Sequence, residues 1–267
     1  MYCITVNDEH SEKIESLNYL PVGLGENIRS KNFLRDNFGK HISHKNSFYG
    51  EYTFHYWLWK NAIQSQKENE WIGFCQYRKF WIKSKKKINP NTFEALNKNI
   101  LKTIDGELEN YESVLGEDLY INQLRLSKFI KKNPMMMIKN PVLFFNKNKR
   151  NIKFHFDMFH GEGILDKAIM ELDNENRADF GYFVNSEVSF NPHNMFICKS
   201  SKILKKYYES VFPWLERCEK IFGFDLDGYG LKRIYGFLAE RYMSYWFKKN
   251  TKFTTLPITV RDISSLN

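Results

Sequence analysis

The stretch Asp36-Asn37-Phe38-Gly39-Lys40-His41-Ile42-Ser43 opens a span, ending at Lys79, that holds the most unusual residues of the chain. From Tyr49 to Gln66, apolar and aromatic residues recur every three to four positions, which predicts a helix with Glu51 in its first turn. The run Trp71-Ile72-Gly73-Phe74-Cys75 then leads into Gln76-Tyr77-Arg78-Lys79. A short apolar run of this kind is typical of a buried parallel strand, and ligands bind at the carboxyl ends of such strands. The span therefore predicts an α/β sheet with a functional site at Gln76–Lys79.

Length and composition favour one globular domain. The chain has 267 residues, of which 42% are hydrophobic, so we expect a single domain over 1–267. Its four cysteines stand far apart, which argues against a disulfide framework or a zinc site and fits a reducing cytosol. We expect no signal peptide and no membrane span, and hence a cytoplasmic protein that is soluble or peripheral at the inner face of the membrane.

The charge is strongly basic. Forty Lys and Arg residues against 31 Asp and Glu residues give a net charge of +9, which favours polyanionic partners such as nucleic acid, anionic lipid or a nucleotide-sugar pyrophosphate. An equally good interpretation is that lysines only solvate the surface. The lysine runs at 83–87 and 147–150 read as solvated loops or as loops that face a membrane.

Other segments show weaker patterns. We expect 113–129 to be polar and irregular, and the helical pattern of 155–172 to be interrupted at Gly161 and Gly163. The remaining expectations are strands at 4–6, 19–25, 135–138, 194–198 and 253–260, and helices at 91–101, 201–221 and 231–247. No repeat or linker divides the chain.

The common nucleotide and hydrolase motifs are absent: there is no GxGxxG, GxxxxGK[ST], HExxH or GxSxG. Asp225-Leu226-Asp227 spells DxD, a signature that holds a divalent ion against diphosphate in many sugar-nucleotide transferases. It follows a predicted helix rather than a strand, so a solvated loop is the better interpretation. We therefore assign no metal ligand, and the sequence does not decide whether Mn²⁺ or Mg²⁺ is a cofactor.

Motifs spread along nearly the whole chain resemble a family of bacterial capsular and exopolysaccharide glycosyltransferases, long filed as a domain of unknown function. They are Asp36-Asn37-x-Gly-x-x-Ile42-Ser43-x-x-Asn46, the helix Glu51 to Asn61, Ile72-Gly73-x-x-Gln76-Tyr77-Arg78-Lys79, Phe190-Asn191-x-x-Asn194-Met195-Phe196-Ile197, Phe212-Pro213-Trp214-Leu215, and Arg233 to Arg241. The resemblance implies a GT-A-like α/β fold, with a mostly parallel sheet flanked by helices and a helical C-terminal part. Some members are similar to galactofuranosyltransferases. Gln76 and Lys79 depart from the family's usual His-Tyr-Arg-Arg.

Sugar transfer suggests roles for these residues. A departing nucleoside diphosphate develops negative charge, so cations at a strand end would lower the barrier. The residues that we expect to bind the donor are Asp36, Asn46, Tyr56, Lys60, Gln76, Tyr77, Arg78, Lys79, Asn194 and Arg241. The alternatives are a surface ion pair for Arg78 and, for Asp36, hydrogen bonds that order its own loop.

An inverting transferase also needs a carboxylate that takes the proton of the acceptor hydroxyl. Glu51 and Glu240, which both lie among aromatic residues, are the candidates. Each could instead pair with a neighbouring arginine or cap a helix. His160 and Trp57 are candidates for acceptor binding, although a lone histidine is more often structural and an aromatic residue on a helix more often belongs to the core.

The expected partners are a UDP-sugar donor and a lipid-linked or oligosaccharide acceptor, with peripheral membrane association and no nucleic acid. The oligomeric state stays open. One alternative is a basic, aromatic-rich protein that binds single-stranded nucleic acid by stacking, but no RNP-like pattern is present. Another is a degenerate transferase that serves as a scaffold in a polysaccharide complex.

Overall fold

The computed structural model describes residues 1–25, 28 and 32–267, which form two compact units. Unit 1 comprises Met1–Glu117, His193–Glu209 and Phe247–Asn267, and unit 2 comprises Asp118–Pro192 and Ser210–Trp246. The chain passes between the units four times, which explains why the sequence contains no recognisable linker. That 1–267 is a single domain stays a prediction.

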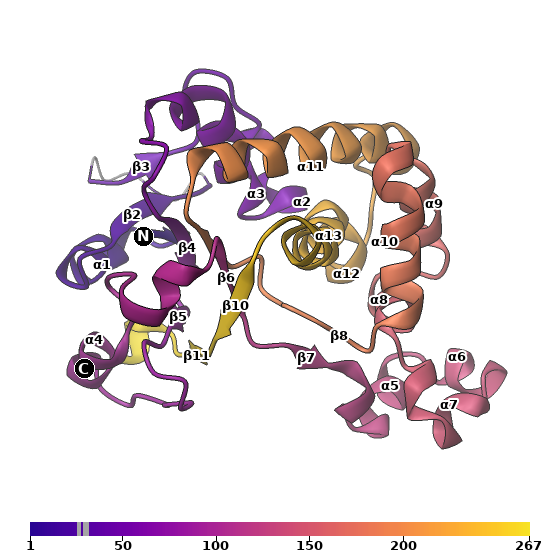
Figure 1. The fold of residues 1–267 in the computed structure, drawn as a ribbon. Coiled ribbons are helices and arrows are strands. Elements are labelled where there is room, and N and C mark those ends of the chain that lie inside the picture. The colour runs from indigo at the N-terminus through magenta and orange to yellow at the C-terminus, as the bar shows by residue number, and fades with distance from the viewer. Residues whose placement is uncertain (26–27, 29–31) are drawn as a thin grey trace. The chain divides into compact units, whose positions relative to one another are not determined.

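Unit 1 is built on a mixed sheet to which the described residues contribute nine strands (Figure 1). They are β1 (Tyr2–Thr5), β2 (Leu20–Gly23), β3 (Leu34–Arg35), β4 (Ile72–Gln76), β5 (Lys79–Trp81), β6 (Ser113–Gly116), β9 (Phe196–Cys198), β10 (Phe253–Leu256) and β11 (Ile258–Val260). Their order is β10-β6-β9-β4-β1-β2-β3, with β5 pairing with β4 and β11. Parallel pairs join β4, β1, β2 and β3 and join β6 to β10, whereas β9, β5 and β11 pair antiparallel. The predicted mostly parallel α/β sheet is confirmed.

The order of the strands locates a switch point in this sheet. Strand β1 lies between β2 and β4, and Ile4 is in register with both Val22 and Gln76. The carboxyl ends of these three parallel strands therefore lie at the same edge. In open α/β sheets this edge, where the strand order reverses, is where ligands bind.

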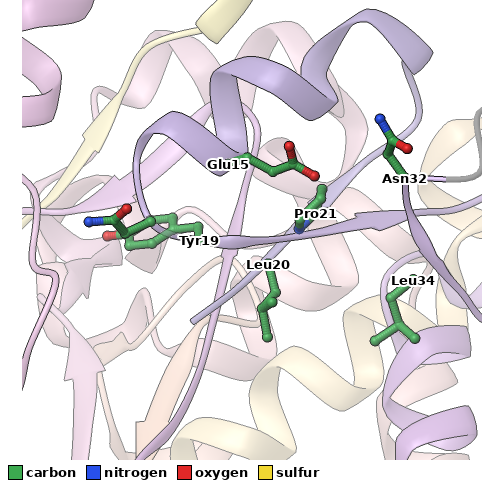
Figure 2. A pocket seen from close by; sticks show the side chains of 7 residues that line it. Glu15, Tyr19, Leu20, Pro21, Asn32 and Leu34 are labelled. Carbon is green, nitrogen blue, oxygen red and sulfur yellow. The ribbon is translucent and has the colours of Figure 1, made fainter.

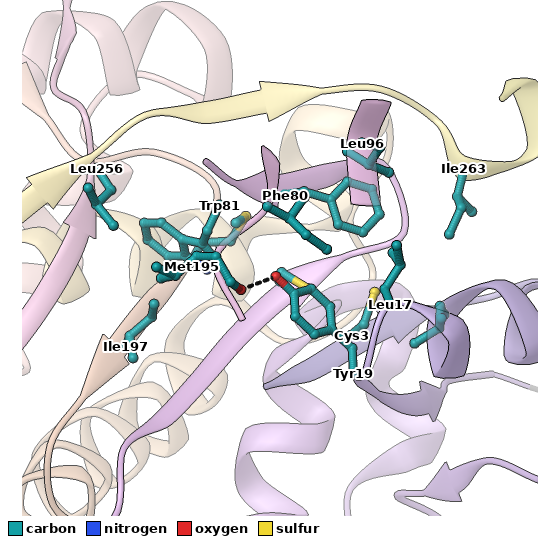
Figure 3. Packing of buried hydrophobic residues seen from close by; sticks show 14 of the residues in the cluster. Cys3, Leu17, Tyr19, Phe80, Trp81, Leu96, Met195, Ile197, Leu256 and Ile263 are labelled. Carbon is teal, nitrogen blue, oxygen red and sulfur yellow. Dashed lines mark hydrogen bonds between the residues drawn. The ribbon is translucent and has the colours of Figure 1, made fainter. Parts of the chain in front are cut away.

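Helices of unit 1 cover the sheet and close its core. They are α1 (Ser11–Ser16), α2 (Asn46–Tyr49), α3 (Tyr52–Trp57) and α4 (Phe93–Asn99), and the unit boundaries fall inside α11 (Ser201–Phe222) and α13 (Ile234–Asn250). Figure 3 shows part of an apolar cluster formed by residues of the sheet together with α1 and α4, with Cys3 of β1, Trp81 of β5 and Ile197 of β9 all buried. The buried Tyr19 hydroxyl donates to the carbonyl of Leu101 at 2.5 Å. A buried core of this kind fixes the strand ends that carry the site.

Unit 2 is mostly helical. Its elements are β7 (Leu119–Tyr120), α5 (Leu126–Lys132), α6 (Pro134–Lys139), α7 (Val142–Phe145), α8 (Ile152–His160), α9 (Ile164–Met170), α10 (Asn174–Ser186), β8 (Ser189–Phe190) and α12 (Tyr229–Lys232). The predicted break between α8 and α9 is confirmed, because Gly161 and Gly163 have φ values of 105° and 77°. Helix α10 was not expected. Its N-cap is Asp173, whose side chain accepts from the backbone N–H of Asn176.

Two expectations from the sequence were wrong. Residues 135–138 form helix α6, not a strand: Pro134 occupies the first turn and the Asn133 side chain caps it by accepting from the N–H of Met136. The segment 113–129 is not merely irregular, because it contains β6, whose four residues are buried between β10 and β9. An Asn-Pro start was visible in the sequence, whereas a four-residue strand offers too few residues for a periodic pattern.

Candidate functional site

The carboxyl end of β4 meets the start of α3 around the side chain of Glu51. Its Oε1 atom accepts one hydrogen bond from Gln76 Nε2 at 3.3 Å and one from Asn194 Nδ2 at 3.0 Å. Gln76 is the last residue of β4, and Asn194 lies just before β9. The structure thus brings together three predicted residues from distant parts of the chain and fixes the orientation of one carboxylate.

The amide of Gln76 is oriented by two further contacts. Its Nε2 also donates to the carbonyl of His193 at 3.0 Å, and its Oε1 accepts from Lys79 Nζ at 3.1 Å. Because an ammonium group can only donate, Lys79 requires the amide oxygen on its own side. The amide N–H groups therefore point to Glu51 and His193. The family that the sequence resembles usually has histidine at this position. The glutamine side chain provides both a donor and an acceptor here.

Positive charge gathers beside this amide cluster. Burial, together with the nearby charges of Lys79 and Arg78, lowers the pKa of His193 to about 3, so its imidazole is neutral at pH 7. The Arg78 side chain is exposed, and its guanidinium carbon lies 5.6 Å from the centroid of the Tyr77 ring. An exposed guanidinium next to a strand end is accessible to an anionic ligand.

The backbone in front of β9 has an uncommon conformation. His193 and Asn194 have φ values of 82° and 53°, in the left-handed region that non-glycine residues seldom occupy. This conformation places the His193 carbonyl on Gln76 and the Asn194 amide on Glu51. Histidine and asparagine are among the residues enriched there, and such backbone outliers cluster at functional sites.

The buried carboxylate of Asp36 contacts helix α3, the helix that begins next to Glu51. Asp36 directly follows β3 and is 1% exposed, and burial raises its pKa although a hydrogen bond with Thr53 opposes the shift. Its Oδ2 atom has no hydrogen-bond partner among the described residues. Asn46 donates to Thr53 Oγ1 at 3.2 Å and to the carbonyl of Gly50 at 3.0 Å. Asp36 and Asn46 are thus linked through Thr53, two residues beyond Glu51.

The aromatic residues of α3 and of the π-helical segment that follows it divide into a buried and a half-buried group. Trp57 is 4% exposed, and its Nε1 donates to the carbonyl of Phe38 at 3.0 Å, which anchors the loop after Asp36. Lys60 Nζ lies 3.2 Å from the centroid of the Trp59 ring and 5.5 Å from that of Tyr56. Lys60 belongs to a π-helical segment, Leu58–Ala62, and such segments frequently occur at functional sites. The acceptor role of Trp57 stays a prediction, and its contacts are those of a core residue.

Glu240, Arg241 and His160 form a separate cluster within unit 2. The Arg241 guanidinium is 1% exposed, donates to Glu240, and contacts His155 Nδ1 at 3.1 Å and His160 Nε2 at 3.4 Å. Its carbon lies 4.5 Å from the centroid of the Phe190 ring. The pairing of Glu240 with a neighbouring arginine is the alternative that the sequence had left open. The roles of all three residues in sugar transfer stay predictions, and their contacts stabilise unit 2.

Replacing Arg241 should therefore destabilise unit 2. We expect Arg241→Met to lower the free energy of unfolding by about 3 to 5 kcal/mol, because it leaves Glu240 and two neutral histidines without their common donor. Urea unfolding monitored by circular dichroism measures the change. Lys167→Met, which removes an exposed cation from α9, should stay within about 0.5 kcal/mol. Equal stability of Arg241→Met and wild type would contradict the structural role of this cluster.

A family model described as "Domain of unknown function (DUF4422)" matches residues 3–251. The chain belongs to this family. A search of curated protein sequences gave no significant match. Among solved structures, the DUF4422 chain is similar to one described as a WbbM bifunctional glycosyltransferase in its apo form, with a TM-score of 0.62 and 18% sequence identity. The similarity covers 97% of this chain and 45% of that one, so the DUF4422 chain corresponds to less than half of the larger protein. At this identity the similarity establishes the GT-A-like fold.

Residues at the end of β1 were missed by the sequence analysis. His10 is buried, contacts Thr5 Oγ1 at 2.7 Å and Ser264 Oγ at 2.5 Å, and its ring centroid lies 5.0 Å from that of Tyr77. Burial lowers its pKa. The rule that ligands bind at carboxyl strand ends, applied to β1 as it was to β4, would have found this group in the DUF4422 chain. His193 had no comparable local signal.

A pocket with different chemistry lies at the opposite edge of the sheet (Figure 2). It is lined by Glu15, Asn18, Tyr19, Leu20, Pro21, Asn32 and Leu34. Leu20 pairs with Tyr2 at the amino ends of their strands, whereas Gln76 pairs with Ile4 at the carboxyl ends. None of the described residues that line it is a cation. We therefore place the candidate site of this DUF4422 chain at Gln76 and not at this pocket.

Metal ligands and membrane spans can be assessed for residues 1–25, 28 and 32–267. Within them, no three or more His, Cys, Asp or Glu side chains are grouped so that they could hold a metal ion. Asp225 and Asp227 are exposed in the loop between α11 and α12. In the same part of the chain, no helix combines the length and apolar character needed to cross a bilayer.

Proposed function

We propose that the chain is a glycosyltransferase that moves a sugar from a UDP-sugar to a hydroxyl group of a growing polysaccharide. One observation carries the proposal: the carboxylate of Glu51 is held by two amides beside Lys79 and Arg78, at the carboxyl end of β4. A base for the acceptor hydroxyl and a cationic group for the departing diphosphate are the two elements that inverting sugar transfer from a nucleotide uses. The similarity to the WbbM structure and the resemblance of the sequence motifs support the same chemistry.

In the proposed reaction, Glu51 takes the proton of the acceptor hydroxyl while the oxygen of that hydroxyl bonds to the anomeric carbon of the donor. The bond from that carbon to the diphosphate breaks, and its electron pair stays on the phosphate oxygen. Arg78 and Lys79 stabilise this charge, and the planar guanidinium of Arg78 is suited to a bidentate contact with phosphate. Gln76 and Asn194 keep the carboxylate in position. No step is assigned to a metal ion.

Asp36 supports binding of the nucleotide. It follows β3, and its buried Oδ2 atom has no hydrogen-bond partner among the described residues. A buried acceptor without a partner costs free energy, which a ribose hydroxyl would recover by donating to it. We propose a hexose donor, with galactofuranose as one candidate from the resemblance, and a lipid-linked or oligosaccharide acceptor of a capsular, lipopolysaccharide or exopolysaccharide pathway.

Binding of UDP gives a direct test. At about 100 times its Kd, UDP should add about 2.7 kcal/mol to the free energy of unfolding and raise the melting temperature. Arg78→Met should weaken UDP binding about tenfold because it removes a charge-assisted contact. Lys86→Met, which removes an exposed cation elsewhere in unit 1, should leave it unchanged.

Activity is tested by a screen of nucleotide sugars, including furanose donors, against lipid-linked acceptors with and without manganese. Release of UDP that depends on the acceptor is the expected result. Stabilisation by oligonucleotides in a salt-sensitive manner, with none by UDP, would contradict the proposal. If UDP bound but neither sugar transfer nor hydrolysis of the donor occurred, the chain would be a degenerate transferase that serves as a scaffold.

A further inference from the structure

The excess positive charge of the chain is concentrated in one stretch of unit 2. Residues 119–156 contain nine Lys or Arg residues and no Asp or Glu. Since the whole chain has 40 basic and 31 acidic residues, the remainder is balanced at 31 of each. The net charge of +9 is thus a local property of this stretch. Seven of the nine side chains are exposed: Arg125, Lys128, Lys131, Lys132, Lys139, Lys147 and Lys149.

The same stretch contains three short helices, α5, α6 and α7 (Figure 1). Each of them exposes large apolar side chains. Phe145 is 90% exposed, Ile138 71% and Met135 60%. Ile130, Val142 and Phe144 are exposed as well. We use the name α5–α7 face for the surface that these six residues and the seven cations contribute, all within residues 125–149. A soluble surface rarely presents so many neighbouring large apolar groups unless it meets a partner.

These apolar groups are held in place by ordered structure. Phe129 of α5, Met137 of α6 and Leu143 of α7 are buried, so each helix is anchored by one side and exposes another. The buried guanidinium of Arg150 donates to the carbonyls of Leu143 at 2.8 Å and Phe144 at 3.5 Å, which satisfies the C-terminal end of α7. Phe144 and Phe145 are therefore presented on a capped helix.

We infer that the α5–α7 face docks the protein on an anionic phospholipid surface. Apolar side chains enter the boundary between headgroups and acyl chains, while the surrounding lysines meet the negative headgroups. A second copy of the chain is disfavoured, because two faces with seven exposed cations each repel one another. Nucleic acid would match the charge but would leave the aliphatic side chains Met135, Ile138 and Val142 without partners.

The other basic run, in unit 1, differs from the α5–α7 face. Lys83 to Lys87 was also a candidate for membrane contact, but Lys85 pairs with Glu107 at 3.1 Å. That run has no large hydrophobic residue among the exposed ones, so it lacks the apolar half of a membrane contact. It is a matched control in the same chain. The docking surface does not depend on which sugar is transferred.

Flotation with vesicles tests the inference with the full chain. Wild-type protein should bind vesicles of phosphatidylcholine and phosphatidylglycerol at a 3:1 ratio, about tenfold or more tightly than pure phosphatidylcholine, and added salt should weaken binding. Ile138→Ser with Phe145→Ser should reduce binding to the anionic vesicles at least tenfold. Both side chains are exposed, so folding should be unaffected, as circular dichroism would verify.

Two controls complete the experiment. Met170→Ser removes an exposed apolar side chain from α9, and Lys85→Gln with Lys86→Gln and Lys87→Gln neutralises the other basic run; both should bind like wild type. Equal binding to neutral and anionic vesicles, or no binding to either, would overturn the inference. So would a Phe145→Ser variant that binds normally but loses an oligomer seen by light scattering, which would assign the face to a second copy.

Discussion

Glu51→Gln should reduce the turnover of sugar transfer by about 10² to 10⁴, the range typical for loss of a general base. Glutamine keeps an Oε1 atom that can accept from Gln76 and Asn194, so the local hydrogen bonds survive. It removes only the ability to take a proton. We therefore expect kcat to fall while KM and the affinity for UDP change little, as initial-rate kinetics and a thermal shift with UDP would show.

The control for this substitution is Glu12→Gln. Glu12 is exposed in the first turn of α1, whereas Glu51 is the N-cap residue of α3, so both carboxylates lie at the positive end of a short helix. Glu12→Gln should change stability by a similar small amount and leave kcat unchanged. If Glu51→Gln retained more than half of wild-type kcat, another residue would have to be the base. Glu240→Gln would then be the next variant to measure.

Asn194 allows the positioning of Glu51 to be separated from the strain of the backbone. Asn194→Gly keeps a residue that tolerates a φ of 53° but removes the amide that donates to Glu51. A loss of turnover without a loss of stability would assign the effect to the side chain. This variant therefore extends the Glu51 measurement from the base itself to the groups that orient it.

The location of the candidate site was predictable from the sequence because its signals are local. An apolar run that ends in Gln76 marks the end of a strand, and helical periodicity placed Glu51 in a first turn. The contact between Glu51 and Asn194 spans 143 residues and depends on how β9 pairs with β4, which no local pattern encodes. The left-handed φ of His193 is likewise set by tertiary contacts.

The same limit explains the candidates that the sequence could not rank. Glu51 and Glu240 both lie among aromatic residues, and only the fold shows that one is held by amides and the other pairs with Arg241. The net charge was known from composition, but its concentration on the α5–α7 face required the exposure of each side chain. The prediction of residues 135–138 as a strand had hidden this face.

Acidification from pH 7.5 to 5.5 should destabilise both units strongly, because each contains at least two histidines that burial keeps neutral. Burial lowers the pKa of His55 and His193 in unit 1 to about 3, and of His155 and His160 in unit 2 to about 3 and about 2. In the unfolded chain these groups bind protons near pH 6.5. Between the two pKa values the unfolded state holds more protons, so stability is lost as pH falls through 6.5 toward 3.

The expected slope follows from the number of protons. Each histidine contributes about 1.4 kcal/mol per pH unit well below pH 6.5, so a pair contributes about 3 kcal/mol per pH unit to its unit. Asp36 in unit 1 and Asp157 in unit 2 oppose this loss, because burial raises their pKa and the folded state then binds their protons more readily. The loss caused by the histidine pairs is large compared with a typical free energy of unfolding of about 5 to 15 kcal/mol.

Urea midpoints at pH 7.5, 6.5 and 5.5 measure this slope, and one variant assigns it. His55 lies in unit 1 with its ring centroid 4.3 Å from that of Phe74, and its Nδ1 atom is 2.7 Å from the Tyr208 hydroxyl. His55→Phe keeps the aromatic packing but loses the hydrogen bond with Tyr208, so its urea midpoint should be lower than that of wild type at pH 7.5. Because phenylalanine cannot bind a proton, the midpoint of the variant should fall less steeply as the pH is lowered. His44→Gln, at an exposed position, should keep the wild-type slope. Midpoints that do not change between pH 7.5 and 5.5 would show that the histidines are not held neutral, and would remove the basis for treating His193 as a neutral neighbour of Arg78.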